Sequence, residues 1–103
     1  MDTAFIRDRI TKLRLSKGVS EYRMSYELGH SRGYVNNISS GKVLPSMAEF
    51  LAICEYFGIT PSEFFDEANA APMQLNGLMN TVKQMDESDL QLLQLTADRL
   101  TKK

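Results

Sequence analysis

The sequence predicts an all-α fold. Apolar residues recur at spacings of three and four along most of its length, which is the period of one face of an α-helix. Serine, threonine or aspartate precedes several of these stretches and glycine follows several, as expected of helix caps. No segment of any length alternates apolar and polar residues as a half-buried strand does. We therefore expect helices joined by short turns.

The first helix is expected within residues 4–18. Its apolar side chains Ile6, Ile10 and Leu13 follow one another at spacings of four and three, which places them on one stripe that faces a core. Gly18 then ends the helix, because glycine adopts the left-handed conformation at a helix end most easily.

The second helix is expected over residues 21–28, after the capping residue Ser20. Its inward positions are Met24 and Leu28. The small Ser25 lies between them and allows close approach by another helix.

The third helix is expected to run from Arg32 to about Ser39, with Ser31 as its cap. Val35 and Ile38, three residues apart, supply a thin apolar seam. The other side of this helix is polar, so packing against a core does not explain why the chain forms this helix.

The fourth and fifth helices share one start signature, a serine or threonine followed three residues later by glutamate. Ser46 and Glu49 form such a capping box after Pro45, and Thr60 and Glu63 form another. The fourth helix is expected to be nearly all core. Its expected core residues are Met47, Phe50, Leu51, Ile53, Cys54 and Phe57.

Two further helices are expected after a short connector that ends at Pro72. The apolar stripe of the first consists of Leu75, Leu78, Met79, Val82 and Met85. Asp86 is expected to cap the last helix, whose stripe consists of Leu90, Leu93, Ala97 and Leu100. We expect one domain over residues 1–68 and a carboxyl-terminal helical extension over residues 69–103.

Composition excludes several classes of protein. The chain has 103 residues, 43% of them hydrophobic and 24% charged, which suits one compact domain with a modest core. No apolar run approaches the roughly 20 residues that span a bilayer, and the acidic residues near the amino end do not fit a signal peptide, so we expect a cytoplasmic protein.

Metal, cofactor and enzyme chemistry also lack candidates. The lone Cys54 cannot form an internal disulfide, and its apolar surroundings favour a buried structural thiol. The lone His30 has no companions at metal-ligand spacing and is expected to be a turn residue beside the helix crossing. No histidine pairs with a nucleophile, so we expect no catalytic residues, no metal and no cofactor.

The net charge of −1 hides an asymmetry between the two halves. Residues 1–42 carry eight basic and four acidic side chains, whereas the remainder carries four basic and nine acidic ones. A basic amino-terminal half attracts a phosphate backbone, although a solvated charged helix face has a similar composition.

The second and third expected helices together fit a helix-turn-helix unit. They are short, a tight turn that contains glycine joins them, and a small residue lies where they cross. In such a unit the second of the two helices, here the third expected helix of the chain, enters the major groove of DNA. Its polar side would therefore contact DNA and not the core.

From Ile6 to Phe65, about two thirds of the chain, the sequence resembles the phage-repressor and Cro helix-turn-helix family, also called the xenobiotic-response-element family. The matching features, in chain order, are Ile6 to Arg14, Gly18-Val19-Ser20, Met24-Ser25, Leu28-Gly29, Ser31, Val35, Ile38, Gly41-Lys42, Pro45-Ser46 and Phe57-Gly58-Ile59-Thr60-Pro61. The resemblance implies a five-helix lambda-repressor-like domain. It also implies that the third helix reads bases and that dimers bind pseudo-palindromic operators.

The resemblance implies particular DNA contacts. Arg32 is suited to guanine O6 and N7, and Asn37 to adenine N6 and N7. The implied base-contacting set is Arg32, Gly33, Tyr34, Asn36 and Asn37. The implied phosphate-contacting set, which would position the protein without reading sequence, is Ser20, Arg23, Ser31, Ser40 and Lys42.

Three positions depart from the family pattern. Glu21 stands where the family commonly has a glutamine that donates to a phosphate. Arg14 stands where the family often pairs an arginine with a glutamate at the end of the recognition helix, a position that is Ser39 here. Gly33 has no side chain and costs about 1 kcal/mol relative to alanine inside a helix.

Two further features have more than one interpretation. Tyr22, Tyr26 and Tyr34 fit either an aromatic stacking surface or, preferably, the edge of a core. The stripe at Leu90, Leu93, Ala97 and Leu100 fits either a homodimer interface, which we prefer, or an extra layer folded back on the five-helix core.

We predict a sequence-specific transcriptional regulator, a repressor that binds double-stranded DNA at an inverted repeat as a homodimer through the helix 31–39. The alternative is a helix-turn-helix scaffold that binds a protein partner, such as a toxin or another regulator, with weak or no DNA binding. Glu21, Gly33 and the acidic second half favour that alternative.

Overall fold

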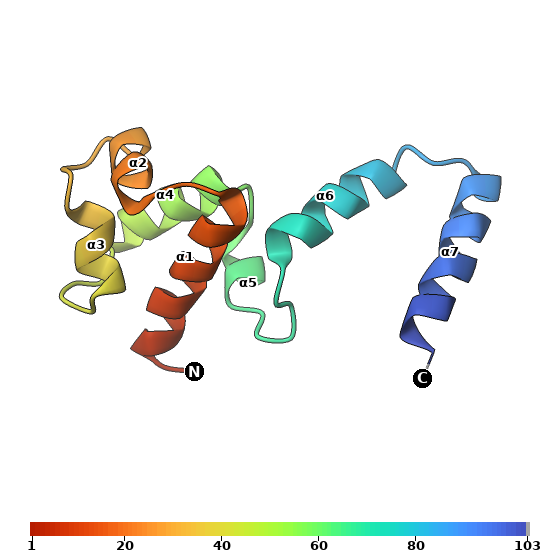
Figure 1. Ribbon diagram of the computed structural model, residues 1–103, viewed down its shortest axis with the longest axis horizontal. Coiled ribbons are helices and arrows are strands. Elements are labelled where there is room, and N and C mark those ends of the chain that lie inside the picture. Colours follow the sequence, from red (N-terminus) through yellow and green to blue (C-terminus); the bar gives the residue numbers. More distant parts are fainter. Residues whose placement is uncertain (103) are drawn as a thin grey trace. The chain divides into compact units, whose positions relative to one another are not determined.

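The computed structural model describes residues 1–102, which form helices joined by turns and contain no strand. The helices of this part of the chain, labelled in Figure 1, are α1 (Thr3–Lys17), α2 (Glu21–Glu27), α3 (Tyr34–Ser39), α4 (Met47–Phe57), α5 (Pro61–Phe64), α6 (Pro72–Val82) and α7 (Glu87–Thr101). The prediction of an all-α fold with five helices and a helical extension is confirmed.

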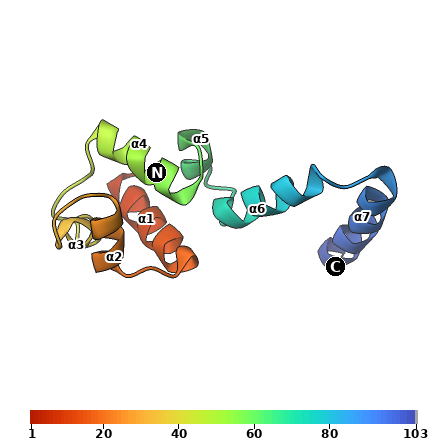
Figure 2. The same ribbon diagram turned by 90° about the horizontal axis from the view of Figure 1, so that it is seen from above.

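The chain divides into two compact units, one from Met1 to Met73 and one that begins at Gln74. In the first unit α2 contacts α3, α1 contacts α3, and α4 contacts α5. Figures 1 and 2 both show α2 and α3 side by side at the end of this unit that lies opposite α5.

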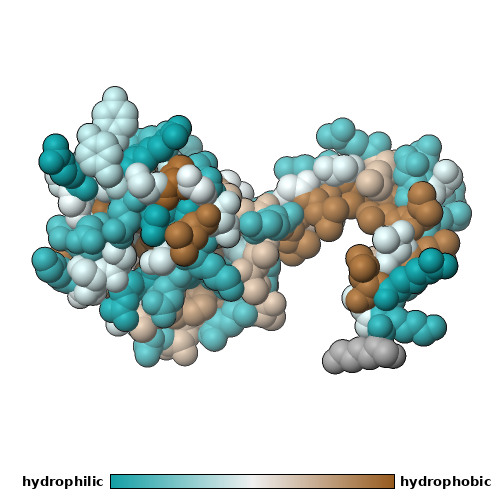
Figure 3. Space-filling model, in the orientation of Figure 1, coloured by the Kyte–Doolittle hydropathy of each residue, from teal (hydrophilic) through white to brown (hydrophobic). Residues whose placement is uncertain are grey.

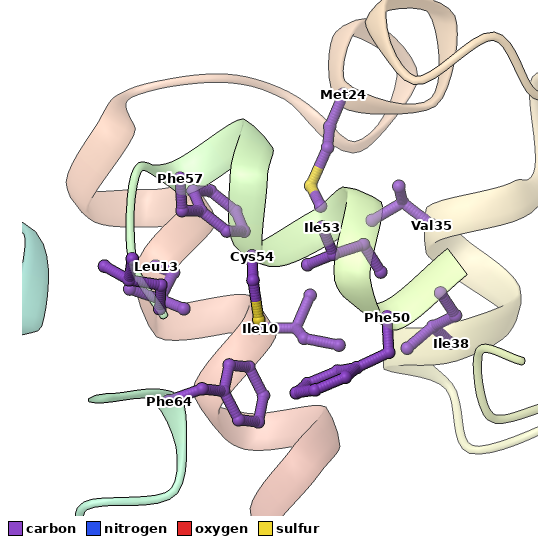
Figure 4. Packing of buried hydrophobic residues seen from close by; sticks show 11 residues of the cluster. Ile10, Leu13, Met24, Val35, Ile38, Phe50, Ile53, Cys54, Phe57 and Phe64 are labelled. Carbon is purple, nitrogen blue, oxygen red and sulfur yellow. The ribbon is translucent and has the colours of Figure 1, made fainter. Parts of the chain in front are cut away.

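The core of the first unit gathers around α4. Figure 4 shows Phe50, Ile53 and Phe57 of this helix directed at residues of α1, α2, α3 and α5. The buried hydrophobic residues are Ile10, Leu13, Met24, Val35, Ile38, Phe50, Ile53, Cys54, Phe57, Ile59 and Phe64. Each large side chain of this kind contributes about 1.5–3 kcal/mol of transfer free energy when it is buried. Because residues of α1, α4 and α5 share this cluster with Met24, Val35 and Ile38, the core joins α2 and α3 to the rest of the unit.

Most of the helix caps predicted from the sequence are present in the structure. The Ser46–Glu49 and Thr60–Glu63 pairs both form complete capping boxes, in which each side chain bonds the backbone of the other residue. Gly18 ends α1 in the left-handed conformation, as predicted. Asp86 caps α7 by accepting a hydrogen bond from Asp89 N at 2.8 Å.

Two residues that were expected in the core of α4 are on the surface instead. Met47 is 74% exposed and Leu51 is 50% exposed, so the core prediction is wrong for both. The core stripe of α4 consists of Phe50, Ile53, Cys54 and Phe57, and residues 47 and 51 lie beside it. Together with Leu44, Pro45 and Phe65, these two side chains line an apolar groove of about 280 Å³.

Arg9 is buried although it is charged, and the sequence analysis did not single it out. Its guanidinium donates to the carbonyl oxygen of Asn69 at 2.7 Å and to that of Asp66 at 2.8 Å. It also lies over the ring of Phe5, with Cζ 5.1 Å from the ring centroid. Arg9 therefore fastens α1 to the segment after α5, and one of the eight basic residues of the first half is used inside the fold.

The second unit has little core of its own. No residue of α7 is buried, and Leu75, Leu78 and Met79 of α6 are all exposed. Figure 3 shows apolar surface along both helices. Among the described residues, no helix is long and apolar enough to cross a membrane.

Candidate nucleic-acid interface

One buried hydroxyl fixes the crossing of α2 and α3. Ser25 is completely buried, and its Oγ donates to the carbonyl oxygen of Glu21 at 2.8 Å. The same oxygen accepts a hydrogen bond from the backbone N–H of Val35 at 3.0 Å. This N–H belongs to the first turn of α3, where it has no partner within the helix. The small residue predicted at the crossing therefore brings the helices together and also satisfies a buried donor.

Val35 and Ile38 are each 1% exposed and join α3 to the core, as predicted. The start of this helix differs from the prediction. The α-helix begins at Tyr34, Gly33 is its cap residue, and no side chain caps it. Ser31 takes part through its carbonyl oxygen, which accepts from Tyr34 N at 3.0 Å, so the prediction of a Ser31 side-chain cap is wrong.

Because the helix starts late, the predicted base-contacting residues fall into two groups. Arg32 and Gly33 lie in the turn that leads into α3, whereas Asn36 and Asn37 lie on the helix. Arg32 and Asn36 are exposed, and Asn37 is half-buried. Gly33 has a φ of −92°, and a Cβ added there would meet nothing within 4 Å.

Tyr34 points back toward the domain. Its ring stacks on that of His30 with centroids 3.8 Å apart, and its hydroxyl is buried. Burial, with the nearby Glu49 carboxylate as a second cause, raises the pKa of Tyr34 to about 12. His30 also approaches Glu49, with Nε2 3.9 Å from Oε2. These contacts engage Tyr34 within the domain and argue against the base contact that was predicted for it.

Glu21, whose negative charge disfavours a phosphate contact, has hydrogen-bond partners within the first unit. Its carboxylate accepts a hydrogen bond from the Ser39 hydroxyl and another from Asn36 Nδ2 at 3.3 Å. The bond from Ser39 lowers the pKa of Glu21, burial opposes this, and Asn36 and the charge of Arg14 lower it further. Glu21 thus links α2 to α3. Arg14, which lacked its expected partner, donates to the carbonyl oxygen of Val19 at 2.8 Å.

The predicted phosphate-contacting residues are all exposed. Ser20 caps α2 by accepting from Arg23 N at 3.0 Å, and Arg23 Nε lies 3.5 Å from Glu27 Oε2. Ser40 Oγ donates to the carbonyl oxygen of Asn37 at 3.4 Å. An exposed ion pair such as Arg23–Glu27 is weak, so the Arg23 side chain is free to turn toward a phosphate.

Arg7 is a basic residue near α3 that the sequence analysis did not select. With Thr3, Gly41 and Lys42 it lines a hollow of about 210 Å³ at the end of α3. Its Nη1 lies 2.7 Å from the position that a Cβ on Gly41 would occupy. The charge of Arg7 was visible in the sequence, but its place beside Lys42 depends on how α1 packs against α3.

The remaining predicted features are not part of this crossing. Leu90 and Leu100 of the proposed dimer stripe are exposed, and Leu93 and Ala97 are half-buried. Cys54 is buried as predicted, and burial raises the pKa of its thiol to about 11. Among residues 1–102, no three histidine, cysteine, aspartate or glutamate side chains are grouped so that they could hold a metal ion.

Comparison with known families agrees with this geometry. The family model for helix-turn-helix proteins of the Cro/C1 type matches residues 10–64, which is just over half of the chain and includes all of α2 to α5. The chain therefore belongs to this helix-turn-helix family, whose members are DNA-binding regulatory domains. Searches of curated proteins and of solved structures give no match.

Proposed function

We propose that this protein is a sequence-specific transcriptional repressor that binds an inverted-repeat operator as a homodimer. The observation that supports this most strongly is the α2–α3 crossing. Ser25, Val35 and Ile38 hold one side of α3 against the unit, while Asn36 on the helix and Arg32 in the turn before it are exposed. A short helix anchored in this way is suited to the major groove.

Base reading is assigned to Arg32, Asn36 and Asn37. Arg32 offers two parallel N–H donors for guanine O6 and N7, and Asn37 offers the donor and acceptor pair that adenine N7 and N6 require. Gly33 allows the backbone to approach the bases closely, because the space where a Cβ would lie is open. Asn36 has a competing partner in Glu21, so its amide must exchange that bond for one to DNA.

Phosphate binding is assigned to the polar and basic residues around the crossing. Arg7 joins the predicted set because it shares a hollow with Lys42. The full proposed set is Arg7, Ser20, Arg23, Ser31, Ser40 and Lys42. These residues fix the position of the protein on the duplex and carry no sequence information.

Dimerisation is assigned to the stripe formed by Leu90, Leu93, Ala97 and Leu100. A helix of 15 residues without a buried side chain gains stability by covering its apolar face. A two-fold partner does so and also doubles the DNA contact. The two half-sites would then lie about 34 Å apart, or a multiple of that distance. Such a repressor acts in the cytoplasm by occupying a promoter.

The alternative, a scaffold that binds only a protein partner, loses one of its supports. Glu21 remains charged, but its bonds with Ser39 and Asn36 give the acid a structural role, so it does not need a protein partner to account for it. We therefore favour DNA as the principal partner.

The salt dependence of binding tests DNA binding itself. With a mixed-sequence duplex, the logarithm of the affinity should fall linearly with the logarithm of salt concentration, by about 0.9 per neutralised phosphate. Lys42→Ala and Arg7→Ala should each reduce that slope by about one. Lys12→Ala, which removes an exposed cation from α1 at a different hollow, should leave the slope unchanged. A shallow wild-type slope with little affinity would contradict the proposal.

A further inference from the structure

Two tyrosines one turn apart on α2 remain in solvent, contrary to the preferred interpretation that they complete a core edge. Tyr22 is 56% exposed and Tyr26 is 74% exposed. With His30 and Arg32 they line a hollow of about 220 Å³. Neither ring is accounted for by packing in the core, and both lie next to the turn that carries Arg32.

The side chain of Arg32 rests on one of these rings. Its guanidinium carbon Cζ lies 5.7 Å from the centroid of the Tyr22 ring, which is within the range of a cation–π contact. Arg32 itself stands in a turn, before the cap residue Gly33, so no helix fixes the direction of its long side chain.

Tyr22, by contrast, stands on a fixed support. It lies in the first turn of α2, next to the cap formed by Ser20, and α2 is held by the fully buried Met24 and Ser25. The backbone that carries the Tyr22 ring is therefore held in place, close to a cation that no helix positions.

We infer that Tyr22 is a positioning residue that holds the guanidinium of Arg32 in the orientation that reads guanine. This inference rests on the proposed role of Arg32 in base reading. A ring that contacts the face of a guanidinium leaves its in-plane N–H donors free, and these are the donors that guanine O6 and N7 accept. Holding the side chain before DNA arrives also reduces the rotational freedom that is lost on binding.

Loss of the Tyr22 ring should affect discrimination between bases more than overall affinity for DNA. Phosphate contacts hold the protein on any duplex, so loss of the ring leaves them intact. The loss is expected in the preference for guanine over another base at the position that Arg32 reads.

Tyr26 provides a matched control. It is the same residue type on the same helix, lines the same hollow and is the more exposed of the two. Tyr26→Ala removes an identical side chain from the same helix, but the ring that contacts Arg32 remains. Tyr22→Phe keeps the ring and removes the hydroxyl, which separates a ring contact from a hydrogen bond by the phenol.

The experiment uses the duplex that the wild-type protein enriches from a random library, and the same duplex with adenine in place of the guanine whose preference depends on Arg32. The readout is the ratio of the two affinities. Tyr22→Ala should lower this ratio about two- to fivefold, the size expected of an exposed cation–π contact. Tyr22→Phe and Tyr26→Ala should leave it within twofold of the wild type.

A second background shows whether the effect passes through Arg32. In an Arg32→Ala protein, Tyr22→Ala should cause no further loss of discrimination, because the group that it positions is gone. The inference would be overturned if Tyr22→Ala lowered the affinity ratio as much in the Arg32→Ala protein as in the wild type. It would also be overturned if Tyr26→Ala lowered the ratio as much as Tyr22→Ala does. Circular dichroism spectra should match the wild type, since both rings are exposed.

The Arg32 Nε–Hε signal in NMR spectra of the free protein reports the contact without DNA. The ring should shift this signal in the wild type and in Tyr22→Phe, and the shift should disappear in Tyr22→Ala. If the protein is selective through Arg32 but Tyr22→Ala discriminates as well as the wild type, the positioning role alone is wrong. If no duplex is enriched, the proposed function fails and the positioning role fails with it.

Discussion

The Glu21 carboxylate at the start of α2 accepts a hydrogen bond from the Ser39 hydroxyl at the end of α3. In the family pattern an acid often stands at the end of the recognition helix and pairs with the arginine that corresponds to Arg14. Here the acid stands on α2, accepts a hydrogen bond from the residue at that helix end, and is still influenced by the charge of Arg14. One departure from the family pattern thus compensates for another.

Glu21→Gln should destabilise the protein by about 1 kcal/mol at pH 7 and by less at pH 3. The Ser39 hydroxyl is the largest cause that holds the pKa of Glu21 below its ordinary value of 4.5. Because the folded-state pKa is the lower one, the folded state binds fewer protons than the unfolded state. The stabilisation is therefore fully present above about pH 4.5 and is lost as the pH falls through the folded-state value.

Urea unfolding of wild type and variant at both pH values measures this effect. Comparing the two proteins removes the contribution of the other carboxylates. A stability difference that is the same at pH 3 and pH 7 would show that the charge of Glu21 does not stabilise the crossing.

Ser25→Ala should cost about 1–3 kcal/mol of unfolding free energy, because the buried N–H of Val35 loses its hydrogen-bond acceptor. Ser16→Ala, at an exposed position of α1, should change stability by less than about 0.5 kcal/mol. Chemical denaturation of both variants checks the prediction. Equal stabilities would mean that the Ser25 hydroxyl contributes nothing.

Gly33→Ala should separate stability from DNA binding. With a φ of −92° and open space at the Cβ position, alanine should leave stability unchanged or raise it by up to about 1 kcal/mol. The added methyl group should nevertheless weaken DNA binding severalfold if the backbone lies against the bases. Gly77→Ala, in α6 and with equally open space, should leave DNA binding unchanged. Wild-type affinity in Gly33→Ala would argue against a contact at this residue.

Leu93→Lys should convert the proposed homodimer to a monomer, because it places a charge within the apolar stripe of α7. Gln91→Lys adds the same charge at an exposed position of α7 that is outside the stripe, and should leave the dimer intact. Sedimentation equilibrium measures both. A wild-type protein that is monomeric at every concentration, or a Leu93→Lys protein that remains dimeric, would rule out this interface.

Sequence reasoning succeeded where the structure depends on neighbours in the chain. The Ser46–Glu49 and Thr60–Glu63 capping boxes join residues three apart, so the pattern contains all that is needed to predict them. The buried faces of α1 and α3 follow from helical spacing in the same way. Ser31 shows the limit of such signals. A serine before a helix need not cap it, and here the α-helix begins at Tyr34 with Gly33 as its cap residue.

The features that were missed depend on residues far apart in the sequence. Arg9 is buried because it bonds carbonyl groups that lie 57 and 60 positions away, and no local signal marks them. Met47 and Leu51 were placed in the core because α4 carries more apolar residues than one stripe needs, and only the packing decides which are covered. Tyr22 and Tyr34 have the same side chain, yet only Tyr34 turns toward the core.

The most direct test of the central claim is a selection from a random duplex library at near-physiological salt. It compares the wild type, the Arg32→Ala/Asn37→Ala variant, and a Lys12→Ala/Asn80→Ala control that loses one cation and one amide elsewhere on the surface. We predict that the wild type and the control enrich the same inverted repeat and that the Arg32→Ala/Asn37→Ala variant does not. If the wild type enriches no sequence, or the variant enriches the same repeat, α3 and the turn before it do not read DNA.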